Sequence, residues 1–178
     1  MSLKEVAVTD ISLNPMKMFG DAWPLLTAGN KERGYNTMTI AWGHMGAVWN
    51  MPGRTVGRGI PTILVYVRPQ RYTKEFIDRE ELFTVSVFDP EKYRKALAYL
   101  GTHSGRNEDK IAKVGLTPKF VDGTTCFEEA SLVFICRKLY HTPILEGSFV
   151  DKAIVAKCFP NKDFSEQYVG EIIKVYQA

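Results

Sequence analysis

The chain has few cysteines and no long apolar segment. Its 178 residues include only Cys126, Cys136 and Cys158, with no C-x-x-C pair, which favours neither a disulfide framework nor a four-thiolate metal site. No apolar run approaches the roughly 18 residues that cross a bilayer, and the start of the chain lacks the apolar core of a signal peptide. We therefore expect a cytoplasmic protein that is not inserted in a membrane.

The chain also lacks a large excess of charge of either sign. Its 23 Lys and Arg residues against 20 Asp and Glu give a net charge of +3, which is too small to indicate a nucleic-acid-binding protein but favours anionic small molecules. With 45% hydrophobic and 12% aromatic residues, the composition is that of a globular protein. A chain of this length usually builds one core, so residues 1–178 are expected to form a single domain.

Several common catalytic and nucleotide-binding motifs are absent. The segment 53–59 has neither the Gly-Lys-Ser/Thr of a phosphate-binding loop nor the glycine spacing of a dinucleotide fingerprint. His44, His103 and His141 are not paired at metal-ligand spacing, and no carboxylate pair stands out for acid–base chemistry. Ser104 lacks a glycine two residues to either side, which excludes a nucleophile elbow.

Strand patterns dominate the sequence. Residues 35–42 alternate with the two-residue period of a strand, and β-branched and aromatic runs of strand length recur along the chain. A turn is predicted at Asp122-Gly123. The predicted strands are residues 35–42, 63–67, 82–88, 131–139, 153–159 and 168–176.

Short helices are predicted between Tyr72 and Val114, over residues 72–79, 90–100 and 107–114. Asp89 is a favourable N-cap before a proline, Asn107 can cap the third helix, and Gly115 can end it in the left-handed conformation. Because strands and helices do not alternate regularly, we expect a mainly β (α+β) protein, a mostly antiparallel barrel with a few short connecting helices.

The segment 67–73 carries Arg68 and Arg71 from a strand to the start of the first predicted helix, where Thr73 can act as the cap. Free amides, the helix dipole and a guanidinium together favour a phosphate group at such a position. Two solvated arginines beside an ordinary cap would give the same pattern, and the spacing alone does not decide between these interpretations.

The segment 36–42 combines a carboxamide, two hydroxyls and an indole on one strand. A flavin ring needs hydrogen-bonding partners along its pyrimidine edge and an apolar wall at its other end, although any half-exposed barrel strand could look the same. Residues 101–107 gather glycines, hydroxyls, a histidine and an arginine in one turn, which predicts either an anion-binding turn or an ordinary loop.

Five segments, in this order over about four-fifths of the chain, resemble the flavin reductase-like, FMN-binding split-barrel family, and within it the flavoredoxin-like branch. The segments are Asn36-x-Met38-Thr39-x-x-Trp42, Val67-Arg68-Pro69-x-Arg71-Tyr72-Thr73, Phe83-x-Val85-x-Val87-Phe88, Gly101-Thr102-His103-Ser104-Gly105-Arg106 with Asp109-Lys110, and Gly170-Glu171-Ile172.

The resemblance implies a homodimeric split barrel of Greek-key topology that binds one FMN per subunit, without a covalent bond, near the dimer interface. It also implies which residues would contact the FMN. Asn36, Thr37, Met38, Thr39 and Trp42 would meet the ring and the ribityl chain, Arg68, Arg71, Tyr72 and Thr73 would lie near the phosphate, and His103, Ser104, Gly105, Arg106 and Lys110 would close the pocket.

Two features depart from the family pattern. Many of these reductases carry a histidine shortly before the closing Gly-Glu, and the matching position here is Ser165, so the electron donor stays open. The loop that bears Arg54 and Arg58 is longer than usual, and it would gate the pocket, contact a nucleotide phosphate, or do neither.

The leading hypothesis is an FMN-dependent oxidoreductase that passes electrons from NAD(P)H to a flavin or another acceptor. The cofactor carries the chemistry, so we expect neither a catalytic side chain nor a metal. The alternative is a flavoredoxin-like carrier that exchanges electrons with a redox partner protein and does not turn over a nicotinamide. A barrel that binds another anion or single-stranded nucleic acid is a weaker hypothesis, because the sequence has no ladder of aromatic and basic residues.

Overall fold

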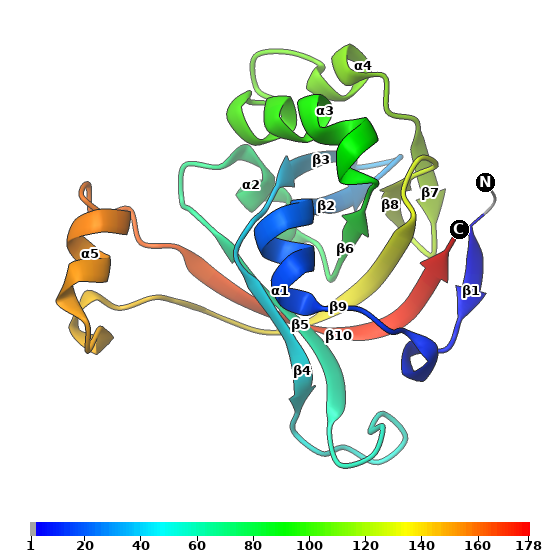
Figure 1. The fold of residues 1–178 in the computed structure, drawn as a ribbon, viewed down its shortest axis with the longest axis horizontal. Coiled ribbons are helices and arrows are strands. Elements are labelled where there is room, and N and C mark those ends of the chain that lie inside the picture. Colours follow the sequence, from blue (N-terminus) through cyan, green and yellow to red (C-terminus); the bar gives the residue numbers. More distant parts are fainter. Residues whose placement is uncertain (1–2) are drawn as a thin grey trace.

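The computed structural model describes residues 3–178 and shows a mostly antiparallel β protein with short helices (Figure 1). The main sheet has the order β3-β2-β6-β9-β10-β5-β4, with β1 added beside β10, and β7 and β8 form a separate hairpin. The strands are β1 (Lys4–Val6), β2 (Leu25–Asn30), β3 (Gly34–Thr39), β4 (Gly43–Val48), β5 (Ile60–Val67), β6 (Leu82–Val87), β7 (Pro118–Val121), β8 (Thr124–Phe127), β9 (Leu132–Pro143) and β10 (Glu166–Gln177).

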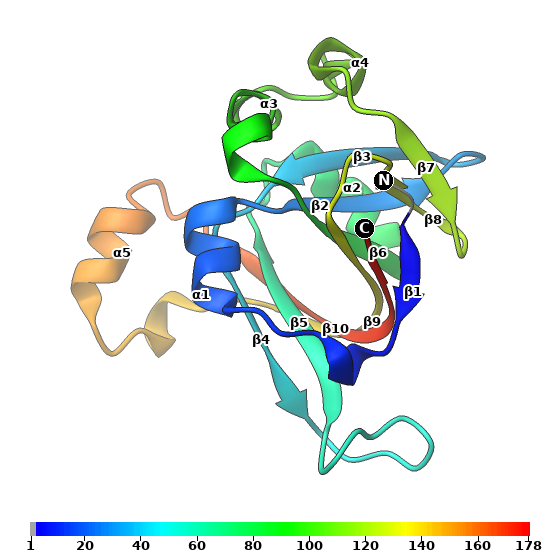
Figure 2. The same ribbon diagram turned by 45° about the vertical axis from the view of Figure 1, so that its right-hand side comes forward.

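The helices are short and lie outside the barrel. They are α1 (Pro15–Lys17), which continues into a π-helical turn (Met18–Ala22), α2 (Tyr72–Arg79), α3 (Pro90–Thr102), α4 (Lys110–Val114) and α5 (Lys152–Cys158). Figures 1 and 2 both show α5 well apart from the barrel, at the end of a long connection between β9 and β10. We call residues 144–165 the arm. No helix within residues 3–178 is long and apolar enough to cross a membrane.

The sheet closes into a split barrel because β3 and β4 are consecutive parts of one extended segment. β3 pairs with β2 at one end of the strand order, and β4 pairs with β5 at the other. The residues between them, 40–42, mark the point where the segment changes partner. β2, the β3–β4 segment and β5 are successive neighbours, and β6 returns to lie beside β2, which is the spatial order of a Greek key. The predicted fold class is confirmed.

Two apolar clusters hold this framework together. The first fills the barrel, where Val65, Phe83 and Phe134 are fully buried. The second lies between the sheet and the helices above it, where Leu97 of α3 and Ile111 of α4 are buried. Because the barrel fills one side of β3 and α3 packs on the other, residues 36–38 are buried on both faces. The strand that carries the predicted ring contacts is therefore held firmly.

The prediction of a strand over residues 153–159 is wrong, because residues 152–158 form α5. Asp151 caps this helix by accepting a hydrogen bond from the Ala153 amide, and Lys and Ala favour the helical conformation. β9 and β10 pair directly with each other, so the segment that joins them does not lie between them as a strand. The helices are thus not confined to residues 72–114, since α1 also precedes that region.

Two predicted caps also differ from the structure. Asp109, and not Asn107, caps α4 by accepting a hydrogen bond from the Ala112 amide at 3.0 Å. Arg71 occupies the N-cap position of α2, and the Thr73 hydroxyl instead accepts a hydrogen bond from the Asn36 side chain. The left-handed Gly115, with φ of 71°, is confirmed as the C-cap of α4.

Candidate functional site

Three adjoining hollows lie along the split in the barrel. The anion hollow, of about 90 Å³, is lined by α2, the end of α3 and α4. The polar hollow, of about 270 Å³, follows the turning point between β3 and β4 and shares Met38 and Arg71 with the anion hollow. The apolar chamber, of about 890 Å³, shares Ala41, Trp42 and Tyr66 with the polar hollow. They form a continuous series from a small cationic end to a large apolar end.

Two cationic side chains meet at the anion hollow. Lys110 is only 3% exposed, and its ammonium donates hydrogen bonds to the carbonyl oxygens of Leu100 at 2.8 Å and His103 at 3.0 Å. Arg71 donates to the carbonyl of Gly101 at 3.1 Å. Within residues 3–178 neither forms a salt bridge with a carboxylate.

The surroundings of Lys110 disfavour its charged form. Burial, and next the nearby Arg71 guanidinium, lower the pKa of Lys110 to about 8. The free first-turn amides of α2 also lie at this hollow. A buried cation beside a second cation is costly unless an anion joins them, so this end of the site can accept an anionic group.

The wall of the anion hollow is held by a buried polar contact. Asn36 is 4% exposed and donates through Nδ2 to the Thr73 hydroxyl at 2.7 Å, which ties β3 to the first turn of α2. Gly105 passes so close that a Cβ there would lie 2.3 Å from Asn36 Oδ1. Only glycine lets the 101–107 turn approach β3 this closely.

The polar hollow follows the change of partner between β3 and β4. The Ile40 amide donates a hydrogen bond to the Pro24 carbonyl at 2.9 Å. Within residues 3–178, the backbone groups of residues 41 and 42 form no such hydrogen bond outside the strands. Trp42 is 46% exposed, and Ser165 from the arm completes the wall. Free peptide groups beside an indole can hydrogen-bond and cover a flat heterocycle.

Arg68 lines the polar hollow, but its charge is committed to the arm. Its guanidinium donates to Asp163 at 2.5 Å and to the Cys158 carbonyl at 2.7 Å. It also lies 5.8 Å from the Trp42 ring and 5.1 Å from the Phe159 ring, both within cation–π range. Arg68 therefore positions the arm beside Trp42, whereas Arg71 remains directed at the anion hollow.

Three predicted residues, Thr37, Gly105 and Arg106, do not line the anion or polar hollow. Thr37 is fully buried, with its hydroxyl 2.8 Å from that of Thr27, inside the barrel. Arg106 packs over the Tyr72 ring and pairs with Glu75 on the outer side of α2.

The structure brings most of the predicted residues together around the two hollows. Asn36, Met38, Arg71, Tyr72, Thr73, His103, Ser104 and Lys110 line the anion hollow, and Met38, Thr39, Trp42, Arg68 and Arg71 line the polar hollow. Sequence reasoning missed Gln70 and Thr102, which lie inside segments already singled out, and Tyr66, which strand alternation could have indicated. Within residues 3–178 no cluster of His, Cys, Asp or Glu could hold a metal ion.

The loop between β4 and β5 is tied away from these hollows. Arg54 donates to both carboxylate oxygens of Glu171, at 3.1 Å from Nε and 2.5 Å from one terminal nitrogen. Arg137 donates to the same carboxylate at 2.7 Å. These two guanidiniums lower the pKa of Glu171 against the opposing effect of its burial. In this structure Arg54 fastens the loop to β10.

Comparison with known proteins identifies the family. The model of the flavin reductase like domain matches residues 16–176, so the chain belongs to this family. A high molecular weight rubredoxin from Moorella thermoacetica is 32% identical over 106 residues, which are 56% of this chain and 46% of that protein. The chain thus spans about half the length of this curated relative.

Solved structures share the fold over nearly the whole chain. Flavoredoxin of Desulfovibrio vulgaris has a TM-score of 0.63 at 21% identity, covering 98% of this chain and 77% of its own. Flavoredoxin from Methanosarcina acetivorans has a TM-score of 0.61 at 23% identity, covering 95% and 75%. An FMN-binding domain of a flavin reductase-like enzyme from Shewanella baltica reaches 0.64 at 13% identity, covering 98% and 76%. The chain therefore has the fold of these flavin reductase-like domains.

Proposed function

We propose that the protein binds FMN without a covalent bond and is an oxidoreductase that passes electrons from NAD(P)H to a flavin or another acceptor. The observation that carries this proposal is the anion hollow, where Arg71 and the buried Lys110 have no carboxylate partner within residues 3–178. The hollow has room for a phosphate but not for a fused ring system, and it opens into the polar hollow. Family membership supports the same cofactor.

The residues of the site fit an FMN molecule from end to end. Arg71, Lys110 and the first turn of α2 would hold the phosphate, and Thr39 and the peptide groups before Trp42 would bind the ribityl chain and the ring edge. When bound, the flavin supplies the hydride-accepting ring. The protein orients it, covers it with the Trp42 indole and keeps water from its phosphate end.

The test is direct. Purified protein should take up FMN with a bound-flavin absorption spectrum, and the loaded protein should oxidise NADH or NADPH when an acceptor is supplied. A protein that remains colourless after incubation with FMN would contradict the cofactor assignment. FMN uptake without any nicotinamide oxidation, with several acceptors, would contradict the reductase activity alone.

A flavoredoxin-like electron carrier is the second candidate function. It is favoured by the position of Ser165 in the polar hollow, which gives no imidazole there, and by the similarity to a rubredoxin of high molecular weight. Rapid mixing of FMN-loaded protein with NADH separates the two. A reductase bleaches the flavin absorption, whereas a carrier stays oxidised until a reduced partner protein is added.

A further inference from the structure

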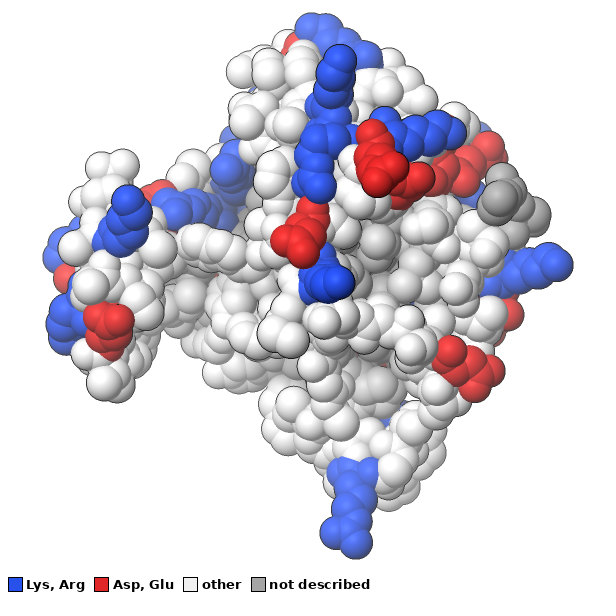
Figure 3. Space-filling model, viewed as in Figure 1, with Lys and Arg blue, Asp and Glu red and all other residues white. Residues whose placement is uncertain are grey.

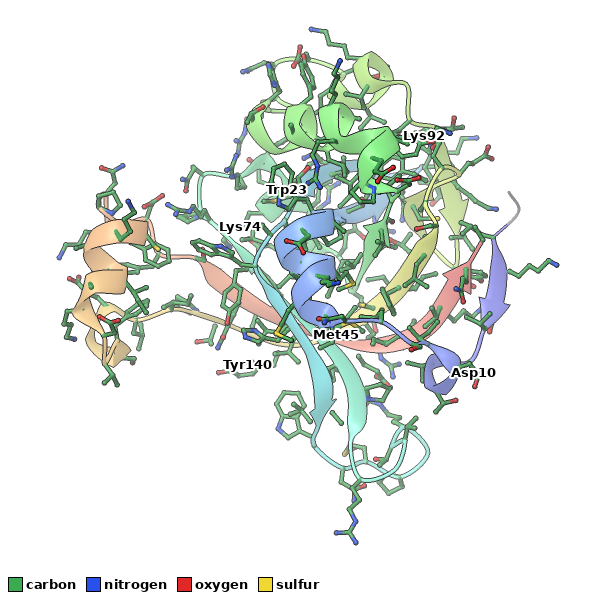
Figure 4. The ribbon with its side chains drawn as sticks, in the orientation of Figure 1. Asp10, Trp23, Met45, Lys74, Lys92 and Tyr140 are labelled. Carbon is green, nitrogen blue, oxygen red and sulfur yellow. The ribbon has the colours of Figure 1, made fainter. Side chains whose placement is uncertain are left out.

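The apolar chamber is the largest of the three hollows. The proposed contacts to FMN lie in the anion hollow and the polar hollow, so the chamber is left for another ligand. It lies between α1, the outer face of β4 and β5, and the arm. In Figure 4, Met45 of this wall lies beside the lower end of α1. Figure 3 shows the recess between the arm and the body as mostly free of charged side chains.

The chemistry of its lining is uniform. No lining residue is Asp, Glu, Lys or Arg, and five aromatic rings, those of Phe19, Trp42, Tyr66, Phe149 and Phe159, contribute to the walls. Its volume of about 890 Å³ is in the range of small-molecule sites. Such walls favour a flat, uncharged molecule and reject an ion, because a charge placed here would lose its water without gaining a partner.

Two polar groups stand at one edge of the chamber. His44 on β4 and Tyr66 on β5 are diagonal neighbours across the strand pair, with their rings 6.0 Å apart in an edge-to-face arrangement. Within residues 3–178 neither side chain has a protein hydrogen-bond partner. Burial raises the pKa of the Tyr66 hydroxyl, which keeps it a hydrogen-bond donor. A ligand with carbonyl oxygens can use both groups.

We propose that the apolar chamber binds a flat, uncharged quinone, with its ring against the aromatic walls and a carbonyl oxygen at His44 and Tyr66. The site adjoins the polar hollow through Trp42 and Tyr66. The role of the quinone as electron acceptor rests on the proposed function. Two electrons from NAD(P)H, passed on through the bound cofactor, and two protons convert a quinone to a hydroquinone.

The arm offers a matched pair of variants. Ile154 lines the chamber and is 43% exposed, whereas Val150 is 99% exposed on the same arm and does not line it. Ile154→Glu introduces a carboxylate into the wall at a position that tolerates solvent, so the fold should survive. Val150→Glu adds the same charge to the arm outside the chamber. Circular dichroism checks that both variants fold.

The experiment is calorimetric titration of oxidised, FMN-loaded protein with duroquinone, whose substituted ring resists attack by the Cys158 thiol. We expect saturable binding, at least tenfold weaker in Ile154→Glu and unchanged in Val150→Glu, and no comparable binding of anthraquinone-2-sulfonate. Equal binding by both variants, or tight binding of the sulfonate, would overturn the proposal. Absence of duroquinone binding would also overturn the proposal. If Ile154→Glu then changed the oligomeric state, the chamber would instead be a contact with a second copy of the chain. Repeating the titration without FMN separates the two claims, because quinone binding by a protein that never takes up FMN would refute the proposed function alone.

Discussion

Lys110 is the residue in which burial and charge conflict most strongly. Its ammonium is 3% exposed and, within residues 3–178, donates hydrogen bonds to two carbonyl oxygens alone, and its pKa falls to about 8. A bound phosphate would supply a compensating negative charge. The buried ammonium, which is costly by itself, would then favour binding of the phosphate.

Lys110 should make FMN affinity depend on pH. In the flavin-free protein the Lys110 ammonium loses its proton near pH 8. A bound phosphate would raise the pKa of Lys110, so FMN binding above pH 8 requires uptake of a proton by this side chain. We expect affinity to be constant at pH 6.5–7.5 and to fall by up to about tenfold per unit above pH 8. Fluorescence titration of FMN at several pH values measures this, and Lys110→Met should remove the dependence. A pH-independent wild-type affinity between pH 7 and 10 would contradict it.

The stability of the flavin-free protein should follow the opposite trend. Because the folded pKa of Lys110 is lowered from 10.5 to about 8, the unfolded chain binds more protons between these values. The contribution of this residue to the free energy of unfolding therefore increases as pH rises from about 8 to 10.5. Urea unfolding of wild type and Lys110→Met across this range isolates it. A difference between the two proteins that does not change with pH would refute the assignment.

Arg71 is directed at the anion hollow, whereas Arg68, three residues before it, is bound to Asp163 of the arm. FMN affinity should therefore depend on Arg71. Arg71→Ala should weaken FMN binding by roughly 1.5–3 kcal/mol through loss of a charge-assisted hydrogen bond to the phosphate. Arg58→Ala, in the exposed loop, is the matched control and should leave affinity unchanged. FMN titration of both variants is the measurement, and wild-type affinity in Arg71→Ala would remove this residue from the site.

At the scale of elements, the arm is placed by a few contacts near its base. Arg68 donates hydrogen bonds to Asp163 and to the Cys158 carbonyl, and its guanidinium lies within cation–π range of the rings of Trp42 and Phe159. Asp163→Asn should loosen the arm, so that trypsin cuts faster at Lys152 and Lys157 while the barrel stays intact. Limited proteolysis followed by mass spectrometry measures this. Equal cleavage rates in both proteins would show that this pair does not hold the arm.

Glu171 fastens the loop between β4 and β5 to the barrel. Glu171→Gln removes the charge shared by Arg54 and Arg137, and we expect a loss of about 1–3 kcal/mol in the free energy of unfolding. The lowered pKa of Glu171 means that this stability is complete above the usual glutamate pKa and is lost as pH falls through the lowered value. Urea unfolding at pH 7 and at low pH should therefore show a difference between wild type and Glu171→Gln only at pH 7.

The elements found from the sequence are those whose local signals agree with their surroundings. The helix over residues 72–79 and the strands over 82–88 and 168–176 have clear periodicity, and the structure contains all three. β4 was missed because Gly43, Gly46 and a histidine interrupt its pattern, and its pairing with β5 comes from the barrel. The β-branched residues of α5 suggested a strand, but its Asp151 cap and the direct pairing of β9 with β10 favour the helix.

The candidate site was partly predictable for a related reason. The resemblance placed Asn36, Arg71 and Lys110 at one pocket, and the structure brings them together around the anion hollow. Sequence could not show that Arg68 is used by Asp163, because that contact joins residues 95 positions apart. Nor could it reveal the apolar chamber, whose walls come from α1, β4, β5 and the arm and meet only in the folded chain.

At the scale of the whole molecule, exposed apolar side chains gather near the hairpin of β4 and β5. Val48, Trp49 and Met51 are 41–49% exposed, and Tyr140 of β9, 47% exposed, has its ring 6.3 Å from that of Trp49. A cluster of large apolar side chains of this kind usually marks an interface. It is the feature that best supports the expected homodimer.

Trp49 provides the test of that homodimer. Its φ of 61° lies in the left-handed region, which asparagine tolerates, so Trp49→Asn removes the indole without disturbing the turn. We expect wild-type protein to sediment as a dimer. The dissociation constant of the dimer should be at least tenfold higher for Trp49→Asn than for wild type. Phe120→Asn is the control, because Phe120 is similarly exposed at 42% but lies on β7, at the opposite end of the molecule from β4 (Figure 1). A monomeric wild type at micromolar concentration, or equal dissociation of both variants, would show that the cluster around Trp49 does not join two copies of the chain.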